Sequence, residues 1–323
     1  MDEFSLIQQY FNHGQYRTSE DGVVLGIGDD AAVLKPAQGE ELLFTTDTLI
    51  QGVHFPEQTA PEAIGHKALA VNLSDIAAMA GTARWFTLAL SLPKADSTWL
   101  KAFSTGLFTL AKQFGVSLVG GDTTRGPLSI TISVIGSTPE NRAVRRSTAS
   151  AGDAIYITGL PGLAALGLAA IKGEVTLSDS DQAKCRDKLD CPQPRLLEGH
   201  FLRNYASSMI DISDGLTADL RHIVQASGCR AVIDSASLKN VLPAVSGLSD
   251  KRIIEAALYG GDDYELLFTV PASEVLKLER SWPPLFTPLT QLGEIMEGEG
   301  VFLRDSEDQL MKVTACGYNH FNA

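Results

Sequence analysis

Cysteines, long apolar runs and basic residues are all scarce in this sequence. Its 323 residues include 4 cysteines, and no two of them are spaced as C-x-x-C. This pattern disfavours a disulfide framework and a cysteine-based zinc site, and it suits a reducing compartment such as the cytoplasm. No segment approaches the roughly 20 apolar residues of a membrane span, and the N-terminus lacks the basic and apolar stretches of a signal peptide. We therefore expect a cytoplasmic protein that has no contact with a membrane.

The shortage of positive charge bears on the kind of partner. Lys and Arg number 26 against 39 Asp and Glu, which gives a formal charge of −13. Binding of nucleic acid through its phosphates needs clustered Lys and Arg, so we do not expect a nucleic-acid partner. A small phosphorylated substrate remains compatible with this charge, because divalent cations can reverse the local sign.

The familiar phosphate-binding motifs are missing or poorly formed. The chain has no G-x-x-x-x-G-K-[ST] stretch, so an ATP site here is not of the P-loop type. The segment Gly26–Ala31 matches the dinucleotide pattern G-x-G-x-x-[GA], but its two variable positions are Asp29 and Asp30, which repel a pyrophosphate. The preceding residues, Asp21–Leu25, are too few to begin a βαβ unit. We therefore reject hydride transfer with a dinucleotide cofactor.

The composition is otherwise that of a globular protein with two domains. Hydrophobic residues make up 44% of the chain and charged residues 20%, and the length exceeds what one core usually holds. In the first half, the apolar pattern predicts strands over 42–46, 86–92, 116–119 and 128–135, helices over 66–80 and 99–114, and a turn over 120–127. In the second half, it predicts strands over 154–158, 209–212 and 265–270 and helices over 162–171 and 216–226.

Between these halves, residues 138–152 are polar, contain three arginines and have no apolar period. We predict an N-terminal domain over 1–140, a linker over 141–152 and a C-terminal domain over 153–323. Strands that alternate with helices in both halves indicate α/β or α+β architecture in each domain.

The aspartates fall beside glycines or at the ends of predicted strands. They are Asp29, Asp30, Asp47, Asp75, Asp122, Asp211, Asp214, Asp262 and Asp263. Carboxylates gathered in one place repel one another, and Mg²⁺ removes that penalty because it takes oxygen ligands and shares them with nucleotide phosphates. Turn formation or helix capping explains any single aspartate equally well. It does not explain the whole set, or Asp75, which the apolar helix pattern predicts to be buried.

Three other features remain open on residue chemistry alone. Arg145 and Arg146 can clamp phosphates, or they can be a solvated pair on a loop. His54 can reach a substrate, or it can be a surface group at a strand end. Residues 159–162 precede a predicted helix, and we interpret them as a packed helix start rather than an anion site.

Seven of these motifs together resemble the thiamine-monophosphate kinase family. They are residues 26–30, 46–48, 67–75, 120–123, 211–216, 260–266 and 317–318, in the family's order. The family is related to aminoimidazole ribonucleotide synthetase and selenophosphate synthetase. The resemblance implies transfer of the γ-phosphoryl group of ATP to thiamine monophosphate. It also implies an N-terminal domain with a mixed sheet and helices that forms a homodimer through its strands, and a C-terminal α+β domain.

The resemblance also implies the roles of individual residues. The magnesium ligands would be Asp30, Thr45, Thr46, Asp47, Asp75, Asp122, Asp211 and Asp214. ATP would meet Gly121, Asp122, Arg146 and Ser213, and thiamine monophosphate would meet His54, Asp262 and Tyr318. The residues expected to carry catalysis are Asp47, Asp122, Arg146 and Asp211. Asp262 stands where the family often has Glu, which shortens that contact by one methylene.

The expected reaction needs no general base, because a phosphate monoester with a second pKa of about 6 is already largely anionic. We therefore expect direct in-line transfer assisted by several Mg²⁺ ions. Two alternatives remain open. One is another ATP-dependent enzyme of the same superfamily, of the ring-closing synthetase type, and the other is a non-catalytic protein that binds magnesium and nucleotide.

Overall fold

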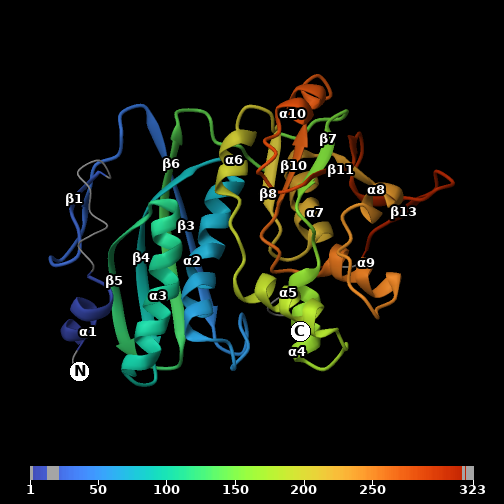
Figure 1. The fold of residues 1–323 in the computed structure, drawn as a ribbon. Helices are drawn as coiled ribbons and strands as arrows, with labels where there is room; N and C mark the ends of the chain where they lie inside the picture. Colours follow the sequence, from blue (N-terminus) through green and yellow to red (C-terminus); the bar gives the residue numbers. More distant parts are fainter. Residues whose placement is uncertain (1–2, 13–21, 315–316, 318–323) are drawn as a thin grey trace. The chain divides into compact units, whose positions relative to one another are not determined.

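The structure is a computed structural model that describes residues 3–12, 22–314 and 317. The chain divides into two compact units (Figure 1). The first unit comprises Met1–Ile76 and Gly81–Ala143, and the second comprises Ala77–Ala80 and Val144–Ala323. No helix or strand lies between Pro139, where β6 ends, and Ala154, where β7 begins. Among the described residues, no helix has both the length and the apolar character needed to cross a bilayer.

The described part of the first unit contains a four-stranded sheet. Its elements are α1 (Glu3–Tyr10), β1 (Val23–Leu25), β2 (Val33–Leu34), β3 (Glu40–Ile50), α2 (Pro61–Ala78), β4 (Thr82–Leu92), α3 (Ser97–Phe114), β5 (Ser117–Arg125) and β6 (Ser129–Pro139). The strand order is β3-β6-β4-β5. The β4–β5 pair is parallel and the other pairs are antiparallel, so the sheet is mixed, as expected.

Helices α2 and α3 cover one face of this sheet (Figure 1). They cross closely, because a Cβ at Gly106 would lie 1.9 Å from the carbonyl oxygen of Glu62. Helix α3 begins after Asp96, whose carboxylate accepts from the N–H groups of Thr98 and Trp99, and it ends at Gly115 with φ 65°. The predicted helix over 99–114 and its stop at Gly115 are therefore confirmed.

Two sequence predictions in this unit are wrong. Residues 120–125 are not a turn, because β5 continues to Arg125 along its parallel neighbour β4. Asp47 does not end a strand, because β3 pairs with β6 over 11 residues from Glu40 to Ile50. In both cases a distant strand supplies the hydrogen bonds, and this outweighs the local turn preference of Gly, Asp and Thr.

The second unit is an α+β domain, as expected. Its strands are β7 (Ala154–Thr158), β8 (Ser208–Asp211), β9 (Arg230–Asp234), β10 (Leu266–Val270), β11 (Leu289–Met296), β12 (Gly300–Arg304) and β13 (Leu310–Lys312). Its helices are α4 (Leu163–Ile171), α5 (Asp179–Asp190), α6 (Leu196–Leu202), α7 (Leu216–Ser227), α8 (Ser235–Lys239), α9 (Asp250–Tyr259) and α10 (Val275–Ser281).

The described strands of this unit form one sheet in the order β13-β12-β9-β11-β7-β10-β8. The β9–β12 pair is parallel and the other pairs are antiparallel. Apolar side chains of α7, such as Leu220 and Ile223, pack on Ile157, Ile210 and Leu267 of the sheet. Strand β8, at the edge of the sheet, ends at the predicted site residue Asp211 and leads directly into the turn before α7, which carries the predicted site residues Ser213 and Asp214.

Candidate active site

A cavity of about 560 Å³ lies within the first unit. The loop Gly26–Ala32 and the β5 segment 118–123 line it, together with Ile7 and Phe11 of α1. Asp30, Gly121 and Asp122 all lie on this cavity. The structure therefore brings Asp30 together with Gly121 and Asp122, which lie about ninety positions further along the sequence. The volume is within the range of small-molecule sites.

The loop Gly26–Ala32 joins β1 to β2, and these two strands pair antiparallel. A dinucleotide fingerprint requires a strand followed directly by a helix. The segment Gly26–Ala31 is thus not a dinucleotide fingerprint, which confirms the sequence interpretation of this motif. Within the loop, the N–H of Asp30 donates to Oδ1 of Asp29 at 2.9 Å, so one of the two carboxylates is engaged with the loop's own backbone.

Gly121 lets the β5 backbone approach its neighbour at the cavity wall. A Cβ at this position would lie 1.9 Å from the carbonyl oxygen of Leu88, and its φ of 153° is unusual for a residue with a side chain. No other residue fits here without displacing β4. The cavity wall at Gly121 and Asp122 is consequently open backbone, which suits the close approach of a ligand.

Asp47 and Asp75 face each other between β3 and α2. Thr45 donates from Oγ1 to Oδ2 of Asp75 at 2.5 Å, and it lies on the same face of β3 as Asp47. Burial, and then the charge of Asp75, raise the pKa of Asp47 to about 6. Asp75 is half-buried rather than buried, which corrects the sequence prediction. Two mutually repelling carboxylates at this place are a natural site for a divalent cation.

The side chain of Thr46 is not part of that pair. Successive side chains of a strand point to opposite faces, and Oγ1 of Thr46 lies 2.8 Å from Oγ of Ser133 on the face away from α2. The structure therefore places Thr45 beside Asp75 and turns the Thr46 hydroxyl away from it.

His54 lies in the turn after β3. The ring atom Nδ1 of His54 accepts from the main-chain N–H of Ile50 at 3.0 Å. The main-chain N–H of His54 donates to the Ile50 carbonyl, also at 3.0 Å. The neutral imidazole therefore carries its proton on Nε2. The ring is oriented by the backbone of β3, which is a suitable arrangement for presenting Nε2–H to a substrate.

In the second unit, the turn from Asp211 to Gly215 is built around the side chain of Asp219, which the sequence analysis did not single out as a site residue. Oδ2 of Asp219 accepts from the N–H groups of Ser213, Asp214 and Gly215, each at 3.1 Å. Burial, and then the charges of Asp211 and Asp214, raise the pKa of Asp219 to about 8. In the sequence, the signal for this role was that Asp219 is an acidic residue in the first turn of α7, which follows the turn from Asp211 to Gly215.

Asp262 lies next to Ser213, because its N–H donates to the Ser213 carbonyl at 2.9 Å. The hydroxyl of Tyr264 donates to Oδ1 of Asp262 at 3.1 Å. Gly317 also reaches this turn, since a Cβ there would lie 2.1 Å from the carbonyl oxygen of Asp214. The structure thus brings Ser213, Asp214 and Asp262 together, while Tyr318 lies outside the described residues.

Arg146 lies elsewhere in this unit. Its side chain is exposed, and its carbonyl accepts from Oγ of Ser227 at 3.0 Å. Ser227 ends α7, a helix of 12 residues, which spans about 18 Å. Arg146 is therefore at the opposite end of α7 from Ser213.

The Gly159–Gly162 segment is a packed helix start, which confirms the sequence interpretation. The N–H of Gly162 at the start of α4 donates to Oδ2 of Asp263 at 2.8 Å. This N-terminus already has a carboxyl partner from the chain itself. Burial raises the pKa of Asp263 to about 8, an effect that the Gly162 bond partly opposes.

The predicted metal ligands are distributed over both units. Within residues 3–12, 22–314 and 317, no three His, Cys, Asp or Glu side chains form a metal-binding group. The donors are nevertheless all oxygens, which are the ligands that Mg²⁺ prefers. The raised pKa of Asp47 shows that its charge is destabilised by its surroundings, so this residue and Asp75 fit a bound cation.

The two units correspond to two known domains. The family model for the AIR synthase related protein, N-terminal domain, matches residues 28–138, and the model for the C-terminal domain matches residues 150–306. The chain thus belongs to the class of AIR synthase related proteins.

Relatives that match over the whole chain define the family more narrowly. Thiamine-monophosphate kinase of Salmonella typhimurium is 44% identical over 324 residues, covering 99% of this chain and 98% of the relative. The enzyme of the same name from Escherichia coli K12 is 45% identical over 326 residues, with the same coverage. The chain belongs to the thiamine-monophosphate kinase family and is a phosphotransferase.

Solved structures agree with this assignment. The thiamine-monophosphate kinase structure from Stenotrophomonas maltophilia is 42% identical with a TM-score of 0.85, and the match covers 94% of this chain and 96% of that one. The AaThiL structure, complexed with AMPPCP and TMP, is 33% identical with a TM-score of 0.75, covering 91% and 92%.

Proposed function

We propose that this chain transfers the γ-phosphoryl group of ATP directly to thiamine monophosphate, giving thiamine diphosphate and ADP. The observation that carries the proposal is the match to AaThiL complexed with AMPPCP and TMP over 91% of the chain. AMPPCP is an ATP analogue that cannot pass on its terminal phosphoryl group, so that complex holds both partners of the proposed reaction.

The described residues suit transfer between two anions without a general base. The attacking phosphate oxygen is already largely ionised near neutrality, since its second pKa is about 6. The remaining difficulty is to align two negatively charged groups, so catalysis depends on positioning and on charge compensation. Carboxylates such as Asp47, Asp75 and Asp122 would serve this purpose by holding divalent cations.

The residues proposed to hold Mg²⁺ are Asp30, Thr45, Thr46, Asp47, Asp75, Asp122, Asp211 and Asp214. Bound Mg²⁺ would supply the positive charge that compensates both the carboxylates and the phosphates. Thr45 donates a hydrogen bond to the side chain of Asp75, and Asn72 accepts one from the main-chain N–H of Asp47. These two bonds hold Asp47 and Asp75 in place. Asp219 holds the turn that presents Asp211 and Asp214.

The proposed substrate contacts are those that the family resemblance implies. We propose that Gly121, Asp122, Arg146 and Ser213 bind ATP. His54, Asp262 and Tyr318 would bind thiamine monophosphate. We propose Asp47, Asp122, Arg146 and Asp211 as the residues that carry catalysis.

We also propose that the N-terminal domain, residues 1–140, forms a homodimer through its strands. The face of the sheet away from α2 presents an apolar row on β3, where Phe44 is 69% exposed and Leu42 is 52% exposed. Ile50 lies on the same face, beyond Thr46 and Thr48. Large exposed apolar side chains grouped on one face mark interaction surfaces. The cytoplasm is the proposed compartment, and it suits the free thiols of Cys185 and Cys229.

The test is an ADP-release assay with Mg²⁺ and ATP in which the acceptor is varied. We expect ADP and thiamine diphosphate in equal amounts with thiamine monophosphate, and neither with free thiamine. ADP release that requires a different, amide-containing acceptor would favour a ring-closing synthetase. ATP binding without ADP release from any acceptor would favour a non-catalytic nucleotide-binding protein.

A further inference from the structure

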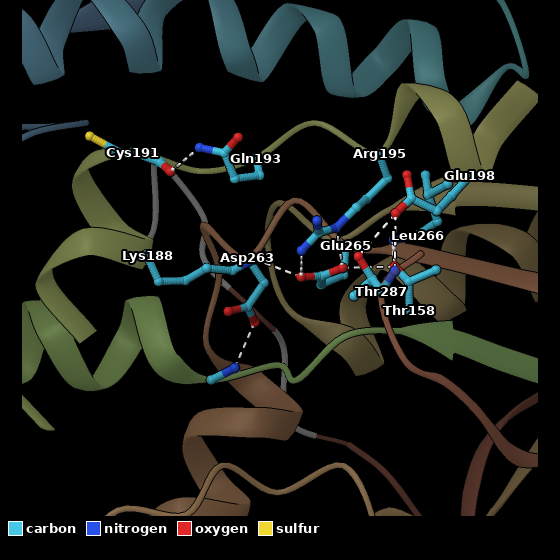
Figure 2. A network of polar contacts seen from close by, with 11 residues as sticks. Thr158, Lys188, Cys191, Gln193, Arg195, Glu198, Asp263, Glu265, Leu266 and Thr287 are labelled. Atoms are coloured by element: carbon cyan, nitrogen blue, oxygen red, sulfur yellow. Dashed lines mark hydrogen bonds and ion pairs between the residues drawn. The ribbon is translucent and has the colours of Figure 1, made fainter. Parts of the chain in front are cut away.

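Glu265, the residue before β10, forms a buried ionic cluster that the proposed function does not use (Figure 2). Only 1% of its surface is exposed. Its Oε2 accepts from Oγ1 of Thr158 and from Nε of Arg195, each at 2.7 Å, and its Oε1 accepts from Nζ of Lys188 and Nη2 of Arg195, each at 2.6 Å. The donors belong to the end of β7, to α5 and to the residue before α6, so one carboxylate connects three elements.

In this cluster one anion, Glu265, serves two cations, Lys188 and Arg195. Burial by itself raises the pKa of Glu265, but the charges and hydrogen bonds of Lys188 and Arg195 outweigh it and hold that pKa below its ordinary value. Burial likewise lowers the pKa of Arg195, and the bonds to Glu265 more than compensate. Loss of the Glu265 charge would therefore leave two cations in a largely buried place without their anion.

The backbone is shaped around this carboxylate. Gly159 has φ 63°, and a Cβ at its position would lie 2.4 Å from both Cδ and Oε1 of Glu265. The carboxylate therefore occupies the space that any other residue's side chain would fill. The hydroxyl of Thr158, which donates to Glu265, also accepts from the N–H of Leu266 at 2.9 Å.

The segment that leads into Glu265 has a strained backbone. Asp262 has φ 67° and Tyr264 has φ 49°, both in the left-handed region that non-glycine residues rarely adopt. Such conformations persist only where the surroundings enforce them, and they cluster at functional sites. Here the N–H of Tyr264 donates to the Ile212 carbonyl at 2.8 Å, in addition to the bond from Asp262 to Ser213.

Glu265 is the residue at which these constraints meet. Its carbonyl accepts from the N–H of Ile212 at 2.9 Å, which ties it to the turn before α7. Its side chain ties it to α5 and α6 through Lys188 and Arg195. The strained segment is therefore held at its C-terminal end by both the main chain and the side chain of one residue.

We propose that Glu265 is a positioning residue, whose ion pairs with Lys188 and Arg195 hold Asp262 in the conformation that contacts the phosphoryl acceptor. This inference rests on the proposed function, in which Asp262 binds thiamine monophosphate. Glu265 touches neither substrate nor the reacting atoms, and it acts through the backbone of residues 262–264.

The test is Glu265→Gln, which keeps the shape of the side chain and removes its charge. We expect the KM for thiamine monophosphate to rise roughly tenfold or more, because small displacements of positioning groups have large effects. The KM for ATP should change much less. A merely structural role would instead lower activity in proportion to the folded fraction, with both KM values unchanged.

Two further variants make the result decisive. Asp181→Asn is the matched control, since Asp181 is a buried carboxylate of the same unit that accepts from Oγ of Ser246 at 2.8 Å. It should leave both KM values unchanged. Lys188→Gln removes one cation and leaves the paired bonds of Arg195, so it should raise the acceptor KM in the same direction but by less. If Glu265→Gln does not fold, Lys188→Gln tests the inference in its place.

A double variant distinguishes positioning from a separate effect. Adding Asp262→Ala to Glu265→Gln should raise the acceptor KM little further, because the first change has already displaced Asp262. The inference would be overturned, while the proposed function stands, if the effects of Glu265→Gln and Asp262→Ala on the acceptor KM were fully additive. It would also be overturned if the acceptor KM were unchanged in folded Glu265→Gln and Lys188→Gln. No thiamine diphosphate from the wild-type chain would instead overturn the proposed function, and this inference with it.

Discussion

The main-chain N–H of Asp47 donates a hydrogen bond to Oδ1 of Asn72 at 3.1 Å, which fixes β3 against α2. Asn72 is fully buried, and its Nδ2 donates in turn to the carbonyl of Ala68. Asp75 lies three residues further along α2, on the same side of the helix. The Asn72 bond therefore sets the position of Asp47 opposite Asp75.

Replacing Asn72 should affect both stability and catalysis. Asn72→Ala leaves the Asp47 N–H without its partner in a buried place, which costs about 1–3 kcal/mol of unfolding free energy. We also expect kcat to fall, because Asp47 loses its alignment with Asp75. Chemical denaturation and steady-state kinetics measure the two effects. Asn240→Ala, at an exposed helix end, is the control, and a wild-type kcat in Asn72→Ala would show that the alignment is not needed.

Asp47→Asn and Asp122→Asn should each abolish turnover and leave the fold intact. Removal of one charge that holds a cation is far more costly than loss of an exposed ion pair, which is worth about 0–1 kcal/mol. Circular dichroism and the rate of thiamine diphosphate formation test this. Asp250→Asn, at an exposed position of α9, should keep full activity. Near-normal turnover in either site variant would count against the magnesium-binding role.

The buried carboxyl of Asp263 predicts a pH-dependent stability. Burial raises its pKa from 3.8 to about 8, so the folded chain retains a proton that the unfolded chain releases. The stabilisation is complete below about pH 3.8 and is lost as the pH rises through about 8. In Asp263→Asn this loss cannot occur. The Tm of the wild type, relative to that of Asp263→Asn, should therefore fall between about pH 5 and about pH 9. A constant difference across that range would mean that Asp263 is ionised in the folded state.

The exposed row on β3 predicts the effect of a charge on assembly. Phe44→Glu places a carboxylate in the proposed interface, and its desolvation should convert a dimer to a monomer. Light scattering after size-exclusion chromatography reports the mass. Leu285→Glu is the matched control, because Leu285 is 98% exposed and lies in the second unit. A wild-type chain that is monomeric at the same concentration, or a dimeric Phe44→Glu, would refute the proposed interface.

Sequence periodicity predicted the elements whose signals are local. Helix α3, with its amphipathic pattern and Gly115 stop, and the apolar strand β7 were both predicted within two residues of their observed bounds. The sequence did not predict that β5 continues to Arg125. The Gly and Thr residues of this segment favour turns locally, and the hydrogen bonds that keep it extended come from β4. Pairings between distant strands do not leave a local signal.

The same distinction holds for the site. Aspartates beside glycines were visible in the sequence, and the structure places Asp30 and Asp122 on one cavity. The sequence did not predict the role of Asp219, because its partners are backbone N–H groups. It did not predict the role of Glu265, because Arg195 and Lys188 are 70 or more positions away in sequence. Their roles depend on packing, which the residue types alone do not reveal.

The central claim is that one step carries the γ-phosphoryl group from ATP to thiamine monophosphate. The most direct measurement mixes the wild-type chain with Mg²⁺, γ-labelled ATP and thiamine monophosphate, and quenches samples during the first turnover. The account predicts that label passes from ATP to thiamine diphosphate with no labelled protein at any time. Labelled protein that forms and decays at the rate of turnover, or label that never reaches thiamine diphosphate, would contradict it.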